Sequence, residues 1–348
     1  MMVDRPGNTG GDENRKRSGE FELIRKLTSG GSYGREVIIG PGDDASAVSL
    51  TQGDSKLLLQ TTDLLIEDVH FRRGWGTTYQ LGWKSLAVNL SDIAAMGGRP
   101  LHAHLNLAIP STWSEDEIME FRRGFYDLAA KYNVALLGGD LSSSPGPLMI
   151  SVMLSGEVKA ECVLRRSGAK PGDVIWVSGE VGNAAAGLKL LKQGKGRSTS
   201  DSPNELIQSF LLPSPEVELG LICAESQCVT ALIDLSDGLA GDLGHILEES
   251  RVGAVLEEGK LPVSDSLRAA AEKRSWNLHD LVLRGGEDYK LLGCSPKDKF
   301  HQLSLLIQSK LGRILFALGE ITAGSKLKMR RQNGRLEPID PRAFDHFA

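Results

Sequence analysis

Aspartate residues follow apolar segments at widely separated places in this 348-residue chain. One stretch, "IDLSDGLAGDLGHI" at residues 233–246, places Asp234, Asp237 and Asp242 among Leu, Ile, Ala and Gly. Crowded carboxylates repel each other, and burying them without cations is costly. Hard divalent cations remove that cost, and Mg²⁺ prefers the oxygen atoms of carboxylates, hydroxyls and backbone carbonyls. The pattern therefore indicates a site for several magnesium ions.

Carboxylates have the same kind of placement in both halves of the chain. They occur in a glycine turn, at strand ends, on an apolar helix and after glycine pairs. Asp92 is the most informative, because it lies within the apolar segment "LAVNLSDIAAMGG" and a buried carboxylate needs a partner. A turn in "GDD" and helix caps at Asp63 and Asp140 are the alternatives for those residues. The full set is Asp43, Asp44, Asp63, Asp92, Asp140, Asp234, Asp237, Glu287 and Asp288.

Phosphoryl transfer between two anions would explain a need for several magnesium ions. ATP and a phosphomonoester acceptor are both negatively charged near neutral pH, and the metal ions would screen their repulsion. An anionic acceptor needs no catalytic base, and no Ser, His or Cys in these motifs has an adjacent activating base. Arg166 in "LRRSGAKPGD" is a candidate phosphate clamp. The chain lacks the G-x-x-x-x-G-K-[ST] motif of P-loop enzymes and the H-R-D and D-F-G motifs of protein kinases.

Two domains must position these residues, because the chain is long for one compact core. Residues 1–19 are polar and Gly-rich, and we expect them to be disordered. Residues 20–158 show a β-α-β-α-β order that predicts an α+β domain, with Asp92 on a helix and Ser114 as the N-cap of the next. Strands and helices alternate in residues 159–348, which predicts a second domain of α/β or α+β type after a Pro-Gly turn.

Composition argues against several classes of protein. The net charge is −5 and Lys and Arg are not clustered, so we expect the protein to bind neither nucleic acids nor anionic membranes. The sequence shows no run of about twenty apolar residues and no apolar core of a signal peptide, so we expect a cytoplasmic protein. Histidine is sparse, which argues against zinc or iron. The four cysteines have no C-x-x-C spacing and are expected to be reduced, with Cys223 and Cys294 buried.

Eight motifs in this order resemble one known family. They are "GPGDDASAV", "TTDLLIEDVHF", "KSLAVNLSDIAAMGGRP", "ALLGGD", "LRRSGAKPGD", "IDLSDGLAGDLGHI", "GGEDYKLL" and the terminal "FDHF". With them the chain resembles the thiamine-monophosphate kinases, of the aminoimidazole ribonucleotide synthetase-like superfamily. The resemblance implies that superfamily's two-domain α+β fold and the reaction of ATP with thiamine phosphate to give ADP and thiamine diphosphate. It also implies a magnesium requirement and a homodimer in which the N-terminal domains pair through their sheets.

The resemblance further implies roles for individual residues. Glu287 would accept a hydrogen bond from the aminopyrimidine of thiamine phosphate, and Phe344 would stack on a ring, with Phe347 as the alternative. His70 would line the same site, although a hydrogen-bonded histidine at a strand end is the structural alternative. Asp242 needs no ligand role, because the helix dipole favours a negative charge in a first turn. Magnesium ligands, some through water, would be Asp44, Thr61, Thr62, Asp63, Asp92, Asp140, Asp234 and Asp237. ATP would contact Tyr126, Gly139, Asp140, Arg166 and Ser236.

Three sister enzymes and one non-enzymatic function are the alternatives. Selenophosphate synthetase would want a reactive Cys in the loop "TSGGSYGREV", and the carbamoyl-dehydrating hydrogenase maturation protein would want a C-terminal Cys; this chain has neither. Aminoimidazole ribonucleotide synthetase is closer, but "TTD" and the "DHF" tail favour the thiamine enzyme. A binding regulator without turnover would have lost a key carboxylate, and none is missing.

Overall fold

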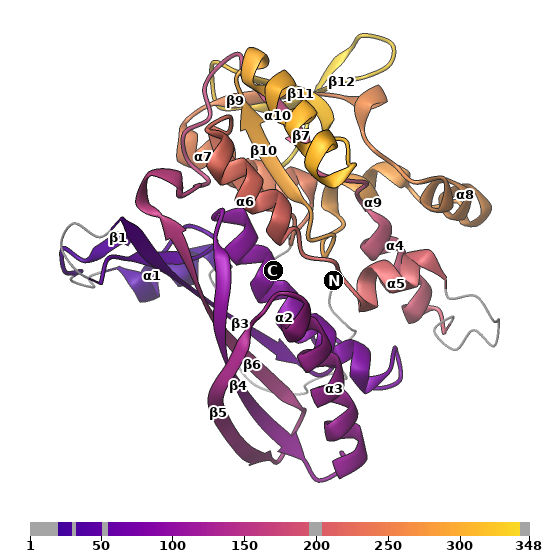
Figure 1. The fold of residues 1–348 in the computed structure, drawn as a ribbon. Helices are drawn as coiled ribbons and strands as arrows, with labels where there is room; N and C mark the ends of the chain where they lie inside the picture. Colours follow the sequence, from indigo (N-terminus) through magenta and orange to yellow (C-terminus); the bar gives the residue numbers. More distant parts are fainter. Residues whose placement is uncertain (1–19, 30–32, 51–54, 195–203, 342–348) are drawn as a thin grey trace.

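A computed structural model of the protein describes residues 20–29, 33–50, 55–194 and 204–341. The chain forms two β-sheets with helices packed on them, and the helix α2 (Thr78–Ala95) contacts both sheets (Figure 1). None of the helices within the described residues is long and apolar enough to cross a membrane. The disorder predicted for residues 1–19 and the predicted stacking of Phe344 or Phe347 concern residues outside these ranges.

The first sheet has six strands in the order β1-β2-β3-β6-β4-β5. Its central strand β3 (Lys56–Ile66) alternates, so that Leu57 and Leu59 are buried whereas Thr62 and Leu64 are exposed on the other face. One face therefore packs against helices and the other faces outward. The remaining elements of this half are α1 (Glu20–Thr28), β1 (Val37–Ile39), β2 (Ser46–Val48), β4 (Arg99–Pro110), α3 (Glu115–Lys131), β5 (Ala135–Ser144) and β6 (Met149–Lys159).

Helices α2 and α3 lie against each other with unusually close backbones. Both begin with a capping box, Thr77 with Gln80 and Ser114 with Glu117, which confirms the predicted N-cap at Ser114. A Cβ atom added at Gly82 would lie 1.9 Å from the Phe121 carbonyl oxygen, so only glycine permits this approach. The close packing fixes α2 on the sheet, which matters because α2 carries Asp92.

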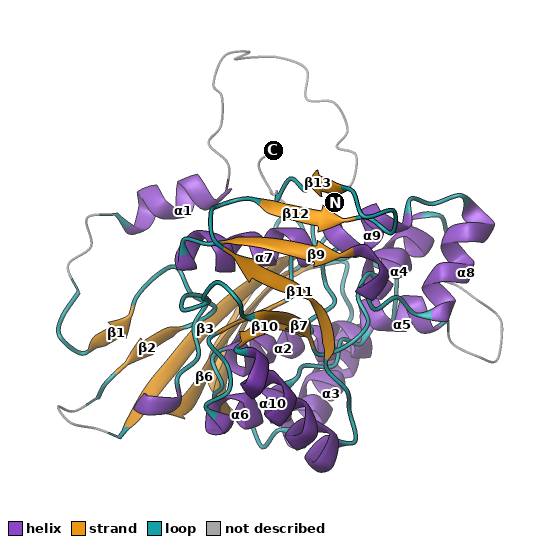
Figure 2. Ribbon diagram, turned by 90° about the horizontal axis from the view of Figure 1, so that it is seen from above, coloured by secondary structure: helices purple, strands orange, loops and turns teal. Residues whose placement is uncertain are grey.

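The second sheet has seven strands in the order β13-β12-β9-β11-β7-β10-β8, and Figure 2 shows β9, β11, β7 and β10 side by side. All its pairings are antiparallel except that of β12 with β9, so it is a sheet of α+β type. Its elements are β7 (Val174–Val177), α4 (Asn183–Lys192), α5 (Glu205–Leu211), α6 (Val217–Ser226), β8 (Ala231–Asp234), α7 (Leu239–Ser250), β9 (Gly253–Glu257), α8 (Asp265–Arg274), α9 (Leu278–Arg284), β10 (Leu291–Ser295), α10 (Lys297–Leu311), β11 (Phe316–Thr322), β12 (Leu327–Arg330) and β13 (Leu336–Pro338).

The two halves share part of one hydrophobic core. Leu86 and Leu90 of α2 belong to the same buried cluster as Trp176 of β7 and Cys223 of α6. All four cysteines are free, and the predicted burial of Cys223 and Cys294 is confirmed, since both are fully buried. The chain passes from one sheet to the other through residues 160–173, and the domain limits 20–158 and 159–348 stay a prediction.

Candidate active site

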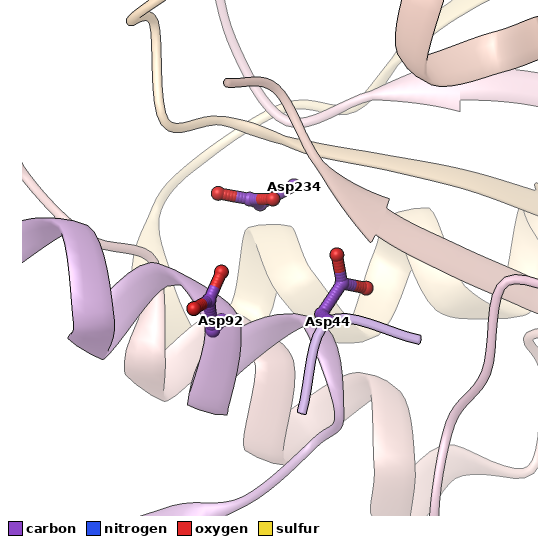
Figure 3. Close-up of side chains that lie close together, drawn as sticks. All are labelled: Asp44, Asp92 and Asp234. Carbon is purple, nitrogen blue, oxygen red and sulfur yellow. The ribbon is translucent and has the colours of Figure 1, made fainter. Parts of the chain in front are cut away.

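Three aspartates from three different elements converge where the two sheets meet. Asp44 lies in the turn before β2, Asp92 in the last turn of α2, and Asp234 at the end of β8. One carboxylate oxygen of each lies within 4.8 Å of the other two (Figure 3). We call these three residues the aspartate cluster. Tertiary structure thus brings together the carboxylates of three of the eight predicted magnesium ligands.

Neighbouring side chains orient each member of the aspartate cluster. The Thr61 hydroxyl donates to Asp92 Oδ2 at 2.5 Å, and the Ser91 hydroxyl donates to Asp234 Oδ2 at 2.6 Å. Arg166 forms an ion pair with Asp44, in which Nη2 lies 2.7 Å from Oδ1. Asp44 Oδ2 is buried and has no hydrogen-bond partner among the described residues. A buried carboxylate oxygen without a partner is costly, so this atom points to a missing cation.

The electrostatics of the cluster are unfavourable for three ionised carboxylates. Burial, and then the charges of Asp63, Asp234 and Asp44, raise the pKa of Asp92 well above its ordinary value. Burial and the nearby charge of Asp44 raise the pKa of Asp234 to about 8. A divalent cation would reverse both effects, because it stabilises the ionised form of its ligands. The donors are all oxygen, which suits Mg²⁺.

Strand β3 places its predicted ligands on two different faces. Thr61 and Asp63 share the face of the buried leucines, and burial together with the charge of Glu287 raises the pKa of Asp63 to about 6. Thr62 lies on the opposite face, where its hydroxyl donates to the carbonyl of Val152 at 3.1 Å. Asp63 therefore adds charge to the aspartate cluster, whereas the Thr62 hydroxyl points away from it.

Asp140 lies on the outer face of the first sheet, away from the aspartate cluster. It pairs with Asn106 on β4, Asn106 pairs with Ser151 on β6, and Ser151 pairs with Leu64 on β3. Residues paired across strands point to the same face, so Asp140 shares the face of Leu64 and not that of Asp63. Asp140 is exposed on a strand that, within the described residues, forms this edge of the sheet. One chain therefore does not bring Asp140 to Asp92.

The two other predicted ATP contacts of the first half also lie apart from the aspartate cluster. Tyr126 is 40% exposed on α3, with the guanidinium of Arg122 4.5 Å from its ring centroid. Gly139 lies on β5, where an added Cβ would lie 1.7 Å from the carbonyl oxygen of Leu105. This strand position therefore requires glycine for close pairing of β5 with β4.

Residues 233–246, "IDLSDGLAGDLGHI", form the end of β8, the following turn and the start of α7. Asp242 is buried in the first turn of α7 and accepts from the backbone N–H groups of Asp237 and Gly238, at 3.2 and 3.1 Å. These bonds confirm a structural role for Asp242. Burial, and then the charge of Glu20, raise the pKa of Asp237 to about 6. Ser236 and Asp237 come two and three residues after Asp234, and the charge of Arg166, which pairs with Asp44, also acts on Asp237.

His70 and Glu287, the two residues predicted for the substrate site that the structure describes, lie in loops. His70 Nδ1 accepts from the backbone N–H of Ile66 at 3.0 Å, which orients the ring at the end of β3. Glu287 has a left-handed backbone, with φ of 71°, and its N–H donates to the Ser236 carbonyl at 2.8 Å. Asp288, which belonged to the carboxylate set, instead accepts from the N–H groups of Gly182 and Ala184 at the start of α4. Asp288 is therefore a helix cap.

A cavity of about 460 Å³ opens beside α2 and α5. Aromatic residues from both halves line it, including Trp75, Trp113 and Phe210, and Lys84 of α2 also faces it. Lys84 is 3% exposed and forms an ion pair with Glu287. The cavity is thus next to one of the residues predicted to bind substrate.

Sequence reasoning missed two residues of this site, Ser91 and Lys84. Both lie on the helix of Asp92, and each had a local signal. A lysine inside the apolar segment "LGWKSLAVNL" requires a partner for the same reason as Asp92 does. Ser91 is a hydroxyl next to a predicted ligand, and its bond to Asp234 joins α2 to β8.

Comparison with known proteins agrees with this architecture. Residues 42–158 match the family model "AIR synthase related protein, N-terminal domain", and residues 170–332 match the corresponding C-terminal domain. A thiamine-monophosphate kinase of Bacillus subtilis (strain 168) is 36% identical over 330 residues, covering 94% of this chain and 99% of that relative.

Two solved structures have the same fold across nearly the whole chain. "AaThiL complexed with AMPPCP and TMP" has a TM-score of 0.79 at 31% identity and covers 94% of this chain and 97% of that chain. Thiamine-monophosphate kinase from Stenotrophomonas maltophilia K279a has a TM-score of 0.73 at 38% identity and covers 88% of this chain and 93% of that chain.

Fold and site together define a two-domain α+β protein of the AIR synthase related class, with a buried aspartate cluster where the domains meet. Within that class, the chain belongs to the thiamine-monophosphate kinase family. The resemblance recognised in the eight sequence motifs is therefore confirmed.

Proposed function

We propose that this protein transfers the γ-phosphoryl group of ATP to thiamine phosphate by direct in-line displacement, giving ADP and thiamine diphosphate. The observation that carries the proposal is the aspartate cluster in a chain of the thiamine-monophosphate kinase family. A relative at 31% identity was solved with AMPPCP and TMP, which supports ATP and thiamine phosphate as the substrates here. Because ATP is the phosphoryl donor, we place the protein in the cytoplasm.

Magnesium would be held by Asp44, Asp92 and Asp234, whose donors fit the ion. Asp63, Asp237 and Thr61 would be further ligands, either directly or through water. When bound, the ions supply neutralisation of the phosphate charges. Arg166 would turn from Asp44 toward the phosphates of ATP, and Ser236 would donate a hydrogen bond to them. The acceptor phosphate is already an anion, so no side chain has to remove a proton.

The thiamine end of the acceptor would extend from the aspartate cluster toward the aromatic cavity beside α2. Glu287 would accept a hydrogen bond from the aminopyrimidine, and His70 would border the same site. Trp75, which lines the cavity, offers an aromatic ring that suits a cationic thiazolium. Phe344 remains our proposal for the stacking aromatic, at a position outside the described residues.

Formation of thiamine diphosphate tests the function directly. Purified protein is incubated with ATP, Mg²⁺ and thiamine phosphate, and the products are separated by chromatography. If thiamine diphosphate does not form while another phosphoryl acceptor is consumed, the assignment is wrong. Transfer from ATP made chiral at the γ-phosphorus should invert the configuration, because one in-line displacement has no phosphoenzyme; retention would contradict the direct mechanism.

We further propose a homodimer that pairs through the first sheet. Its outer face and edge carry exposed apolar side chains, including Leu64, Leu137, Leu141 and Met149. Exposed apolar residues gathered on one sheet are typical of a protein interface. Asp140 lies on that same face, so a partner's Gly139–Asp140 segment would supply what one chain leaves incomplete.

Complementation between two inactive variants tests the shared site. Asp92→Asn and Asp140→Asn are each expected to be inactive as homodimers. A refolded equal mixture should recover about a quarter of the wild-type rate, since half of the dimers are mixed and each holds one intact site. A mixture that stays inactive, although mass spectrometry detects the mixed dimer, would show that Asp140 acts within its own chain.

A further inference from the structure

Lys84 is a buried lysine of α2 that contacts groups from the second half of the chain. Its ammonium group pairs with Glu287, donates to the Phe210 carbonyl at 3.2 Å, and lies 3.5 Å from the centroid of the Phe210 ring. Only 3% of the residue is exposed. A buried charge with a carboxylate, a carbonyl and a ring around it is held in one geometry.

The same helix positions the aspartate cluster. Lys84 precedes Asp92 by eight residues, which is about 12 Å along an α-helix. Between them, Ser91 is bonded to Asp234, and α2 packs on both sheets. One rigid element therefore sets the distance between the proposed phosphate end of the site and Glu287.

Glu287 depends on Lys84 for its side-chain geometry. Its backbone is held by the hydrogen bond to Ser236 in a left-handed conformation, whereas its side chain is 24% exposed. The negative charge of Glu287 contributes to raising the pKa values of Asp63 and Asp237. A carboxylate beside so many others would turn toward water if nothing held it, because like charges repel.

We propose that Lys84 is a positioning residue for thiamine phosphate, which fixes the Glu287 carboxylate beside the aromatic cavity so that it can accept the substrate's amino group. The inference rests on the proposed function, and in particular on Glu287 as a substrate residue. It adds that recognition of the thiamine ring depends on a lysine of the helix that also carries Asp92.

Steady-state kinetics of Lys84→Met, which keeps the length and removes the charge, test the proposal. We expect the KM for thiamine phosphate to rise at least tenfold, with kcat and the KM for ATP within about twofold of wild type, because ground-state binding of one substrate is lost. In a Glu287→Gln background, Lys84→Met should change the KM for thiamine phosphate less than twofold, since both residues act through one contact. Lys290→Met is the matched control, because it removes a lysine paired with Glu216 away from the cavity.

Two results with Lys84→Met would overturn the proposal. One is an unchanged KM for thiamine phosphate in Lys84→Met. The other is an equal rise in the KM values for ATP and thiamine phosphate that combines multiplicatively with the effect of Glu287→Gln. That result would mean that Lys84 has a general structural role. If Glu287→Gln has a normal KM while wild type makes thiamine diphosphate, the premise fails and the proposal with it. If wild type makes no thiamine diphosphate, the proposed function is wrong.

Chemical rescue covers the case in which Lys84→Met does not fold. Lys84→Ala lacks three methylene groups and the ammonium, which together correspond to propylammonium. Added propylammonium should lower the KM for thiamine phosphate of this variant in a concentration-dependent manner, whereas propanol should not. Equal effects of the two additives would show that filling space, and not charge, is what Lys84 supplies.

Discussion

Replacement of Asp92 by asparagine distinguishes a metal ligand from a structural residue, because its two expected effects have opposite signs. In metal-free protein the substitution removes a charge from a crowded cluster and should raise stability. In the presence of magnesium it removes a ligand and should lower both metal affinity and rate. A residue with only a structural role would lower stability under both conditions.

The size of the first effect follows from the geometry of the cluster. Two ionised carboxylates within 4.8 Å repel by at least about 3.5 kcal/mol at an effective dielectric constant of 20. Protonation already relieves part of this repulsion, because the pKa of Asp92 is raised by burial and by Asp63, Asp234 and Asp44. Asparagine can still accept from Thr61, so that hydrogen bond survives. We expect metal-free Asp92→Asn to gain about 1–3 kcal/mol at pH 8, or several degrees in Tm.

Thermal unfolding in EDTA and in Mg²⁺ with ATP measures both effects on the same samples. Wild type should gain Tm on addition of Mg²⁺ and ATP, whereas Asp92→Asn should gain little, and its rate should fall by about 100-fold or more. Asp173→Asn is the matched control, because Asp173 is a buried aspartate that accepts from Lys170 and Thr230 outside the cluster. If Asp92→Asn destabilises the metal-free protein and keeps its response to Mg²⁺, the assignment of Asp92 as a ligand is refuted.

Two further predictions concern pH and the start of α7. The folded-state pKa of Asp234 is raised to about 8, so the native state holds a proton that the unfolded chain releases near pH 4. Stability in EDTA, measured as Tm, should therefore fall as pH rises from about 4 to 8. Addition of Mg²⁺ should restore more of the lost stability at pH 8.5 than at pH 6. A Tm in EDTA that does not change with pH would contradict this prediction. Asp242→Ala should lose about 2 kcal/mol in denaturant unfolding, because two buried N–H groups lose their acceptor, whereas Asp242→Asn should keep it. Equal losses in the two variants would show that the charge of Asp242 matters instead.

Local patterns were sufficient for several parts of the fold. Apolar spacing predicted the helix that carries Asp92, and Ser114 as an N-cap predicted the start of α3. Asp242 could be separated from Asp234 and Asp237 because its position in a first turn already had a local explanation. Each of these features depends on a few consecutive residues, so the local sequence was enough to predict it.

The sequence was less able to predict where a side chain points when a local rule allowed two positions. Asp288 had the same Gly-Gly context as the candidate ligands, yet it caps α4. Thr62 and Asp63 are adjacent, but alternation along β3 sends their side chains to opposite faces. The pattern of residue types does not state which face of a strand will be buried next to a metal site.

The sequence by itself determined the chemistry of this protein, because carboxylates in apolar segments require cations and the ordered motifs identify the family. Tertiary structure decided which carboxylates meet. Asp44, Asp92 and Asp234 converge because a turn, a helix and a strand end from two sheets pack together. Strand register places Asp140 on the other side of the first sheet, and Lys84 of α2 meets Glu287 from the loop between α9 and β10. Register and packing are set by contacts between distant segments, which no local spacing encodes.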